Sequence, residues 1–401
     1  MNKYIYPLVD NPFRKKDLKS AIEVIKTGRI TMSKNVAAFE NQFSNKIKNN
    51  FSIMTNSGSS ANLLALQCLI NPYRKKKLKK GDEVLIPALC WSTSLWPIIQ
   101  SGLKPVFVDV DIDNLNIDLN DMERKISKKT KAIMLVHVLG NCPNMKLLIK
   151  LKKKYNLILI EDTCESLGTM FNKKFLGTFG EFSTFSFYSS HQISSGEGGM
   201  ISCKSREDYE IIKSLRSHGW SRDLSIHKKI IKQNKHLDEK FIFYNSGYNL
   251  RPTEVSAVIA ASQFRDLDKF KKTKNFIRNQ IVKKFRSNNV INNYLKIIDP
   301  THNSDPFWFG IPMILSDKIN RMKFINLINK QGLETRPIIS GNFTKQPAVK
   351  KYLISKKYKL LNADKINDNG FFIGIPFNKI SDNLLNKICN IFEKNLQISK
   401  V

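Results

Sequence analysis

Short apolar runs alternate with stretches of helical periodicity through the first two thirds of the chain. Residues 157–160 (LILI) are apolar without interruption, which suits a strand buried on both faces of a parallel sheet. Similar strand units occur at residues 51–54, 81–94 and 131–145, and helical stretches such as MKLLIKLKKKYN separate them. Strands that alternate with helices at these intervals predict an α/β fold with a mainly parallel, doubly wound sheet.

The pattern changes near residue 266, where longer amphipathic helices begin and only a few strands follow. We therefore expect three parts: an N-terminal arm and first helix (1–30), a large domain (31–265) and a small C-terminal domain (266–401).

The central stretch, residues 161–199, combines a strand end, a polar turn and a glycine-rich turn. Asp162 stands two positions after the apolar run, at the strand end where ligands sit in open α/β sheets. A second predicted strand, residues 184–188, runs into Ser189-Ser190-His191, and residues 196–199 (GEGG) follow. An imidazole ordinarily titrates near neutrality, so His191 is a candidate general base and acid.

The order of these residues resembles the pyridoxal-phosphate sugar aminotransferases of the DegT type. That family has an Asp after a buried strand, then S-F-Y/F-x-x-K, then G-D/E-G-G. Its Lys forms a Schiff base with the cofactor, its Asp pairs with the ring nitrogen and its Ser holds the phosphate. Asp162 and Ser186 occupy those places here, but the Lys position is His191 in FSFYSSHQISSGEGG.

The Lys-to-His change resembles one subgroup of the family, the 3-dehydratases of GDP- or CDP-linked 4-keto-6-deoxy sugars. The resemblance implies fold type I of the pyridoxal-phosphate enzymes, with a large cofactor-binding domain and a smaller α+β domain.

Further site residues are expected from the same resemblance. A strand that leads through a Gly/Ser turn into a helix offers backbone N–H groups to a phosphate, although Ser and Asn are also ordinary N-caps. The resemblance assigns the turn residues Gly58, Ser59 and Ser60, together with Glu165, to the cofactor. It places Trp91 on the cofactor ring, whereas most Trp side chains lie in a core or an interface.

Three segments resemble parts of the family that contact the substrate or a second subunit. Asn249 matches a residue that reaches the cofactor phosphate of the neighbouring subunit, which implies a homodimer with shared active sites. Arg251, Arg336 and Asn342 are candidate substrate contacts. An Arg fork suits a diphosphate, but a surface ion pair is an equal alternative for Arg336.

The presence of His191 at the family's Lys position limits the chemistry that the site can perform. Imidazole cannot hold the cofactor covalently, so the expected resting form is pyridoxamine 5'-phosphate rather than bound pyridoxal 5'-phosphate. The resemblance implies removal of the C3 hydroxyl from a nucleotide-linked 4-keto-6-deoxyhexose, giving a 4-keto-3,6-dideoxy sugar for lipopolysaccharide, with L-glutamate as amino donor. Gln192 and Ser189 differ from the usual family residues, so an altered aminotransferase relative or a cofactor-binding regulator is the alternative.

Composition and charge bear on other classes of protein, such as nucleic-acid-binding, metal-binding and membrane proteins. The net charge of +32 raises nucleic-acid binding, but the lysines are scattered and aromatic residues are not interleaved with them, so we favour a solvated surface and expect no nucleic-acid partner. The cysteines at 68, 90, 142, 164, 203 and 389 lie far apart, so no metal site, disulfide framework or iron–sulfur cluster is expected. With no long apolar stretch and no signal-peptide pattern, we expect a cytoplasmic protein without a membrane partner.

Overall fold

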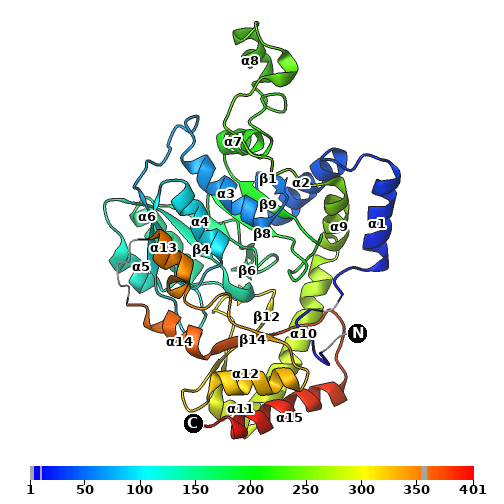
Figure 1. Ribbon diagram of the computed structural model, residues 1–401, viewed down its shortest axis with the longest axis vertical. Helices are drawn as coiled ribbons and strands as arrows, with labels where there is room; N and C mark the ends of the chain where they lie inside the picture. The colour runs from blue at the N-terminus through cyan, green and yellow to red at the C-terminus, as the bar shows by residue number, and fades with distance from the viewer. Residues whose placement is uncertain (1–3, 10, 354–358) are drawn as a thin grey trace.

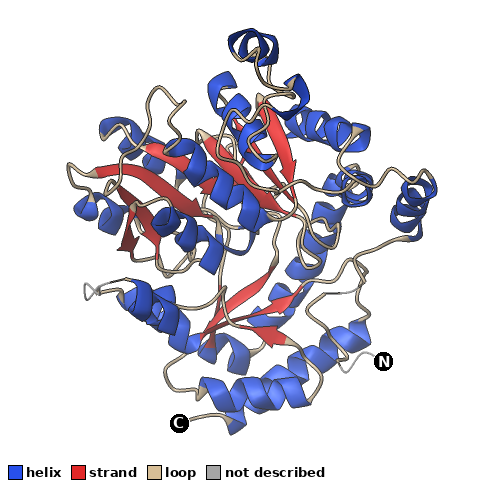
Figure 2. Ribbon diagram, turned by 45° about the horizontal axis from the view of Figure 1, so that its top comes forward, coloured by secondary structure: helices blue, strands red, loops and turns tan. Residues whose placement is uncertain are grey.

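The structure, a computed structural model, describes residues 4–9, 11–353 and 359–401. A seven-stranded sheet in the order β1-β9-β8-β5-β4-β2-β3 forms the centre of the large part, and a four-stranded sheet in the order β10-β12-β14-β13 lies in the C-terminal part (Figures 1 and 2). The strands of the large sheet, in chain order, are β1 (Phe51–Thr55), β2 (Glu83–Pro87), β3 (Lys104–Val108), β4 (Thr130–Val136), β5 (Ile158–Asp162), β8 (Phe182–Ser186) and β9 (Gly199–Cys203).

The remaining elements surround these strands. The first nine helices are α1 (Lys15–Lys26), α2 (Lys34–Ile47), α3 (Gly58–Leu69), α4 (Ser92–Gln100), α5 (Leu119–Lys125), α6 (Met145–Lys154), α7 (Arg206–Arg216), α8 (His227–Gln233) and α9 (Glu254–Phe264). The C-terminal part contains α10 (Leu267–Arg286), α11 (Asn289–Tyr294), β10 (Leu295–Ile297), β12 (Gly310–Leu315), α12 (Arg321–Lys330), β13 (Thr335–Arg336), α13 (Pro347–Tyr352), α14 (Leu361–Asn369), β14 (Gly370–Gly374) and α15 (Asp382–Ile398). Strands β6 (Met170–Phe171), β7 (Lys174–Phe175) and β11 (Ser304–Asp305) form a third, small sheet.

The pairing of the large sheet confirms the predicted α/β class. Strands β3, β2, β4, β5 and β8 pair in parallel, whereas β9 runs antiparallel to both β8 and β1. The apolar run at 157–160 largely forms the buried strand β5. The strand predicted at 184–188 is β8, which ends earlier because its pairing with β9 stops where Ser186 lies opposite Gly199.

Both faces of the sheet are buried, which explains the uninterrupted apolar run that leads into β5. On β2, Val84 and Ile86 pack in the cluster that contains the α3 residue Leu64, while Leu85 between them packs with Leu148 of α6. Neighbouring residues of a strand point to opposite faces, so helices must cover both sides. The predicted domain division at residue 265 falls between α9 and α10 and stays a prediction.

One edge of the large sheet collects the ends of several strands. Val136, Asp162 and Ser186 are the last residues of β4, β5 and β8, and β1 ends at the same edge before leading into α3. Binding sites of open α/β sheets lie at this edge.

Two features lie at opposite ends of the molecule. Helix α8 stands away from the body at the top of Figure 1, and α12 and α15 cover the small sheet at the bottom. Within the described ranges, no helix has both the length and the apolar character that crossing a membrane requires. The cytoplasmic location stays a prediction.

A buried carboxylate fixes the strand that carries Asp162. Glu161 accepts hydrogen bonds from His137 Nε2 (3.1 Å) and from the amides of Gly177 (2.9 Å), Phe179 (2.8 Å) and Gly180 (2.7 Å). Burial alone would raise the pKa of Glu161, but these hydrogen bonds hold it below its ordinary value.

We expect Glu161→Gln to lower the free energy of unfolding by about 3 kcal/mol, because an amide N–H would then face backbone donors in a buried site. Urea denaturation of the variant measures this change, with Glu23→Gln on the exposed face of α1 as the control. A loss no larger than that of the control would contradict the prediction.

Candidate active site

A cavity of about 580 Å³ opens at the carboxyl edge of the large sheet and reaches the small domain. Strand ends and helix starts of the large domain line one side, and Phe309, Ile339 and Phe372 line the other. The cavity brings together eight of the predicted site residues: Gly58, Ser59, Trp91, Asp162, Glu165, Ser186, His191 and Arg336.

Asp162 lies at the base of this cavity and is 5% exposed. Its Oδ2 atom accepts hydrogen bonds from Asn62 Nδ2 (2.9 Å) and Ser94 Oγ (2.7 Å), and its Oδ1 atom accepts one from the amide of Cys164 (3.2 Å). Asn62 is oriented in turn by Thr184, whose hydroxyl donates to Asn62 Oδ1 (2.6 Å). Three donors stabilise the negative charge of this carboxylate in a buried place.

The start of α3 forms a cradle that has room for an anion but not for a side chain. Ser57 caps the helix and accepts the amide of Ser60 at 3.1 Å. A Cβ atom at Gly58 would lie 2.7 Å from Ser186 Cβ and 2.9 Å from Cys164 Sγ. Backbone N–H groups and the positive end of the helix dipole meet here, which is a favourable place for a phosphate.

His191 projects into the cavity from the polar turn after β8. Its ring meets Phe309 edge-on at 5.3 Å between centroids, and its Nδ1 atom is buried without a hydrogen-bond partner. Burial, with a smaller effect of the Lys274 charge, lowers the pKa of His191 to about 4. The imidazole is therefore neutral near pH 7 and able to accept a proton.

Glu165 is a second titratable group on the same wall. Its Oε2 atom accepts the amide of Leu139 at 2.9 Å. Burial, together with the negative charge of Asp162, raises the pKa of Glu165 to about 7. The cavity thus places a neutral imidazole near a carboxyl group that carries a proton for part of the time at neutral pH.

Trp91 and Arg336 both line the cavity, and their roles on the cofactor ring and the substrate stay predictions. Trp91 is 57% exposed, so it is not a core residue, and the alternative that it lies in an interface stays open. Arg336 lines the cavity and also pairs with Glu334, with 2.9 Å between Nη2 and Oε1.

Four predicted residues lie outside the residues that line the cavity. The Ser60 hydroxyl donates to Asn56 Oδ1 (2.6 Å), and Asn342 donates to Asp364 Oδ1 (2.8 Å) inside the small domain. Asn249 is exposed and accepts from Arg251 Nε at 3.0 Å. The roles assigned to these four residues stay predictions.

Gln192, which differs from the usual family residue, also points away from the cavity. Its side chain is 1% exposed and donates to the backbone carbonyl groups of Glu165 and Phe307. It joins the turn after β8 to two neighbouring segments. Gln192 is therefore not part of the surface that lines the cavity.

The sequence interpretation missed several contributors. Asn62 and Ser94 hold Asp162, Ser57 caps the cradle, and Leu8 reaches the cavity from the N-terminal arm. A signal existed for Asn62, because it lies four residues after Gly58 and therefore on the same face of α3. Leu8 had no such local signal.

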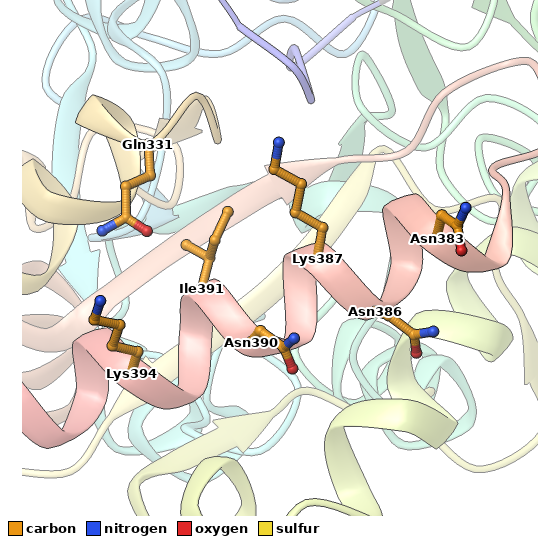
Figure 3. A pocket seen from close by; sticks show the side chains of 7 residues that line it. All are labelled: Gln331, Asn383, Asn386, Lys387, Asn390, Ile391 and Lys394. Atoms are coloured by element: carbon orange, nitrogen blue, oxygen red, sulfur yellow. The ribbon is translucent and has the colours of Figure 1, made fainter.

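Figure 3 shows a separate pocket of about 380 Å³ between α15 and the end of α12. The side chains that line it are Gln331, Asn383, Asn386, Lys387, Asn390, Ile391 and Lys394. Amides and lysines offer hydrogen bonds but no acid–base pair like that of the larger cavity, so we assign the chemistry to the larger cavity.

Comparison with known proteins identifies the family of this chain. Residues 12–393 match the DegT/DnrJ/EryC1/StrS aminotransferase family. This chain belongs to that family. GDP-4-keto-6-deoxy-D-mannose 3-dehydratase of Escherichia coli O55:H7 is 36% identical, over 92% of this chain and 95% of the relative.

Two further relatives are similar over most of their length. The lipopolysaccharide biosynthesis protein RfbH of Salmonella typhimurium is 36% identical, over 90% of this chain and 85% of the relative. A crystal structure of GDP-4-keto-6-deoxymannose-3-dehydratase with a trapped PLP-glutamate geminal diamine superposes with a TM-score of 0.88, at 34% identity, covering 98% of this chain and all of that one (100%).

The residues present fit pyridoxal phosphate, the cofactor that the family membership implies. Asp162 offers a buried carboxylate for a protonated ring nitrogen, the α3 cradle offers a side-chain-free place for the phosphate, and His191 Nδ1 is a buried atom that lacks a partner.

The raised pKa of Glu165 predicts a pH-dependent stability of the cofactor-free protein. The folded carboxyl keeps its proton up to about pH 7, whereas the unfolded chain releases it near the ordinary value of 4.5. The stability contributed by Glu165 is therefore full below about pH 4.5 and is lost as the pH rises through about 7.

We expect Glu165→Gln, which cannot titrate, to lose less unfolding free energy than wild type between about pH 5 and about pH 8. Urea denaturation at both pH values measures the difference. Equal losses in the two proteins would contradict a raised pKa.

Proposed function

We propose that this protein is a pyridoxamine/pyridoxal-phosphate-dependent 3-dehydratase, which removes the C3 hydroxyl of a nucleotide-linked 4-keto-6-deoxyhexose to give a 4-keto-3,6-dideoxy sugar. The observation that carries the proposal is His191. A neutral imidazole lines the cavity, with its Nδ1 atom buried and without a hydrogen-bond partner, at the position where the aminotransferases of the family carry Lys.

The residues that would hold the cofactor follow from the cavity. Asp162 would pair with the ring nitrogen, and Ser59, Ser186 and the start of α3 would hold the phosphate. Trp91 presents an exposed ring for stacking, which contributes about 1 kcal/mol in such contacts. When bound, the cofactor supplies an amine and a conjugated ring that withdraws electrons from neighbouring bonds.

His191 would move the protons. Because its imidazole is neutral, its unprotonated ring nitrogen could accept the proton that the bound cofactor's methylene would release, and the imidazolium so formed could give that proton to the hydroxyl that leaves from C3 as water. A Lys at this position would instead hold the cofactor covalently. The replacement therefore favours loss of water over transfer of the amine.

The substrate and donor are proposed from the relatives. GDP-linked 4-keto-6-deoxymannose is the first substrate to test, and L-glutamate the amino donor, since one related structure holds a PLP–glutamate adduct. The name of the Salmonella relative supports a place in lipopolysaccharide biosynthesis.

The role of His191 predicts the outcome of restoring the lysine. We expect His191→Lys to reduce C3 dehydration at least about 10²-fold, because the general base is lost. The variant should also acquire a covalent bond to pyridoxal phosphate that borohydride reduction makes permanent and mass spectrometry detects.

His236→Lys, which adds a lysine at an exposed position near α8, is the control and should behave like wild type. A wild-type protein that yields a stable amino sugar, or leaves the C3 oxygen in place with every 4-keto sugar nucleotide tried, would refute the dehydratase proposal.

We further propose that the active unit is a homodimer with shared sites. Asn249 and Arg251 are not among the residues that line the cavity of their own chain, and the segment that follows α8 exposes Phe241 (61%) and Phe243 (57%). Large exposed aromatic side chains next to polar groups are typical of interfaces.

Mixing two inactive variants tests the shared site. If Asn249 serves the neighbouring cavity, a heterodimer of His191→Asn and Asn249→Ala contains one intact site. An equimolar mixture, refolded together, should regain roughly a quarter of wild-type activity, because half of the dimers are mixed and each has one working site. No recovery in a mixture that forms mixed dimers would show that each chain supplies its own site.

A further inference from the structure

The N-terminal arm crosses the molecule to reach the small domain. Residues 4–9 lie in the lower half of Figure 1, beside α10 and the small sheet, while α1 packs on α9 higher up. Tyr6 pairs with Leu333 as in a parallel sheet, donating its amide to Gly332 O (3.0 Å) and accepting the amide of Glu334 (3.0 Å).

Close packing fixes this crossing. Tyr6 is 2% exposed and its hydroxyl donates to the carbonyl oxygen of Gly374 at 2.8 Å. A Cβ atom at Gly374 would lie 1.9 Å from the carbonyl oxygen of Leu8, so the arm lies directly on the backbone of β14. The arm is thus a built part of the small domain.

The arm ends at the cavity. Leu8 is one of the residues that line it, on the side of Ile339 and Phe372 and across from the large domain. Its amide donates to Glu334 Oε2 at 2.9 Å. The position of this wall therefore depends on a carboxylate that lies far away in the sequence.

The second oxygen of the same carboxylate holds Arg336. Glu334 Oε1 lies 2.9 Å from Arg336 Nη2, and the two side chains are 15% and 55% exposed. Glu334 is thus largely buried and has one partner for each oxygen. Arg336 also donates from Nη1 to the carbonyl oxygen of Thr335 (3.4 Å), and its side chain stays 55% exposed at the cavity. A guanidinium with one side fixed loses less entropy when its other side binds an anion.

We propose that Glu334 is a positioning residue that links the N-terminal arm to the cavity wall and holds Arg336 in place for the diphosphate of the nucleotide sugar. The inference rests on the proposed function, because it takes a nucleotide sugar as the substrate. Glu334 acts through Leu8 and Arg336 and does not take part in proton transfer.

Kinetics of two variants test the link to Arg336. Glu334→Gln keeps an acceptor for Leu8 but removes the charge that faces Arg336. We expect it to raise KM for the nucleotide sugar about fivefold, the effect of an ion pair worth about 1 kcal/mol. The kcat value and the affinity for pyridoxal phosphate should stay unchanged.

The double variant Glu334→Gln/Arg336→Gln should have the KM of Arg336→Gln alone, because Glu334 has no role once its partner is gone. Asp317→Asn is the control: it removes a carboxylate that pairs with Lys365 on the exposed surface of the same domain, and it should leave KM unchanged.

Hydrogen exchange tests the link to the arm in the protein without substrate. Glu334→Ala should increase exchange at the amide of Leu8 at least tenfold, while Asp317→Asn leaves it unchanged. Unaltered exchange at Leu8, an unaltered KM in Glu334→Gln, or additive effects in the double variant would each overturn the proposal. Failure of the proposed function differs from these results, because the wild-type protein itself would then convert no nucleotide sugar.

Discussion

The buried carboxylate of Asp162 is the group on which the arrangement of the site depends. A carboxylate that is 5% exposed is stable only with donors around it, and those donors come from three different places: Asn62 on α3, Ser94 on α4 and the amide of Cys164. Satisfying one charge therefore fixes two helices against the end of β5. The same helix start that places Asn62 also forms the phosphate cradle.

The same edge of the sheet offers places for both negative and positive charge. The α3 cradle favours negative charge, Asp162 favours positive charge, and an apolar wall with Phe309 lowers the pKa of His191. Glu165, only three residues after Asp162, shows the opposite shift because burial disfavours its charged form. Two groups whose pKa values are pushed apart are suited to different acid–base tasks.

The small domain completes the cavity with a wall that is less polar than the side formed by the sheet edge. Its wall is mostly apolar, and Arg336, the polar side chain that it brings to the lining, pairs with Glu334. The N-terminal arm belongs to this wall although it begins the chain, so the first and the last parts of the sequence meet where the substrate is expected to bind.

The sequence by itself determined the α/β class, the buried strand β5, and the succession of Asp162, Ser186 and His191 on one edge of the sheet. These features depend on local patterns: an apolar run sets a strand, and the residue after the run lies at its end. Only the tertiary structure decided which neighbouring side chains serve the cavity. Asn62 and Asp162 are 100 positions apart, and Leu8 and Glu334 are 326 apart. The orientations of Ser60 and Asn342 were likewise undecided, because a hydroxyl or an amide takes whichever partner the folded chain brings within reach, and residue type alone does not name that partner.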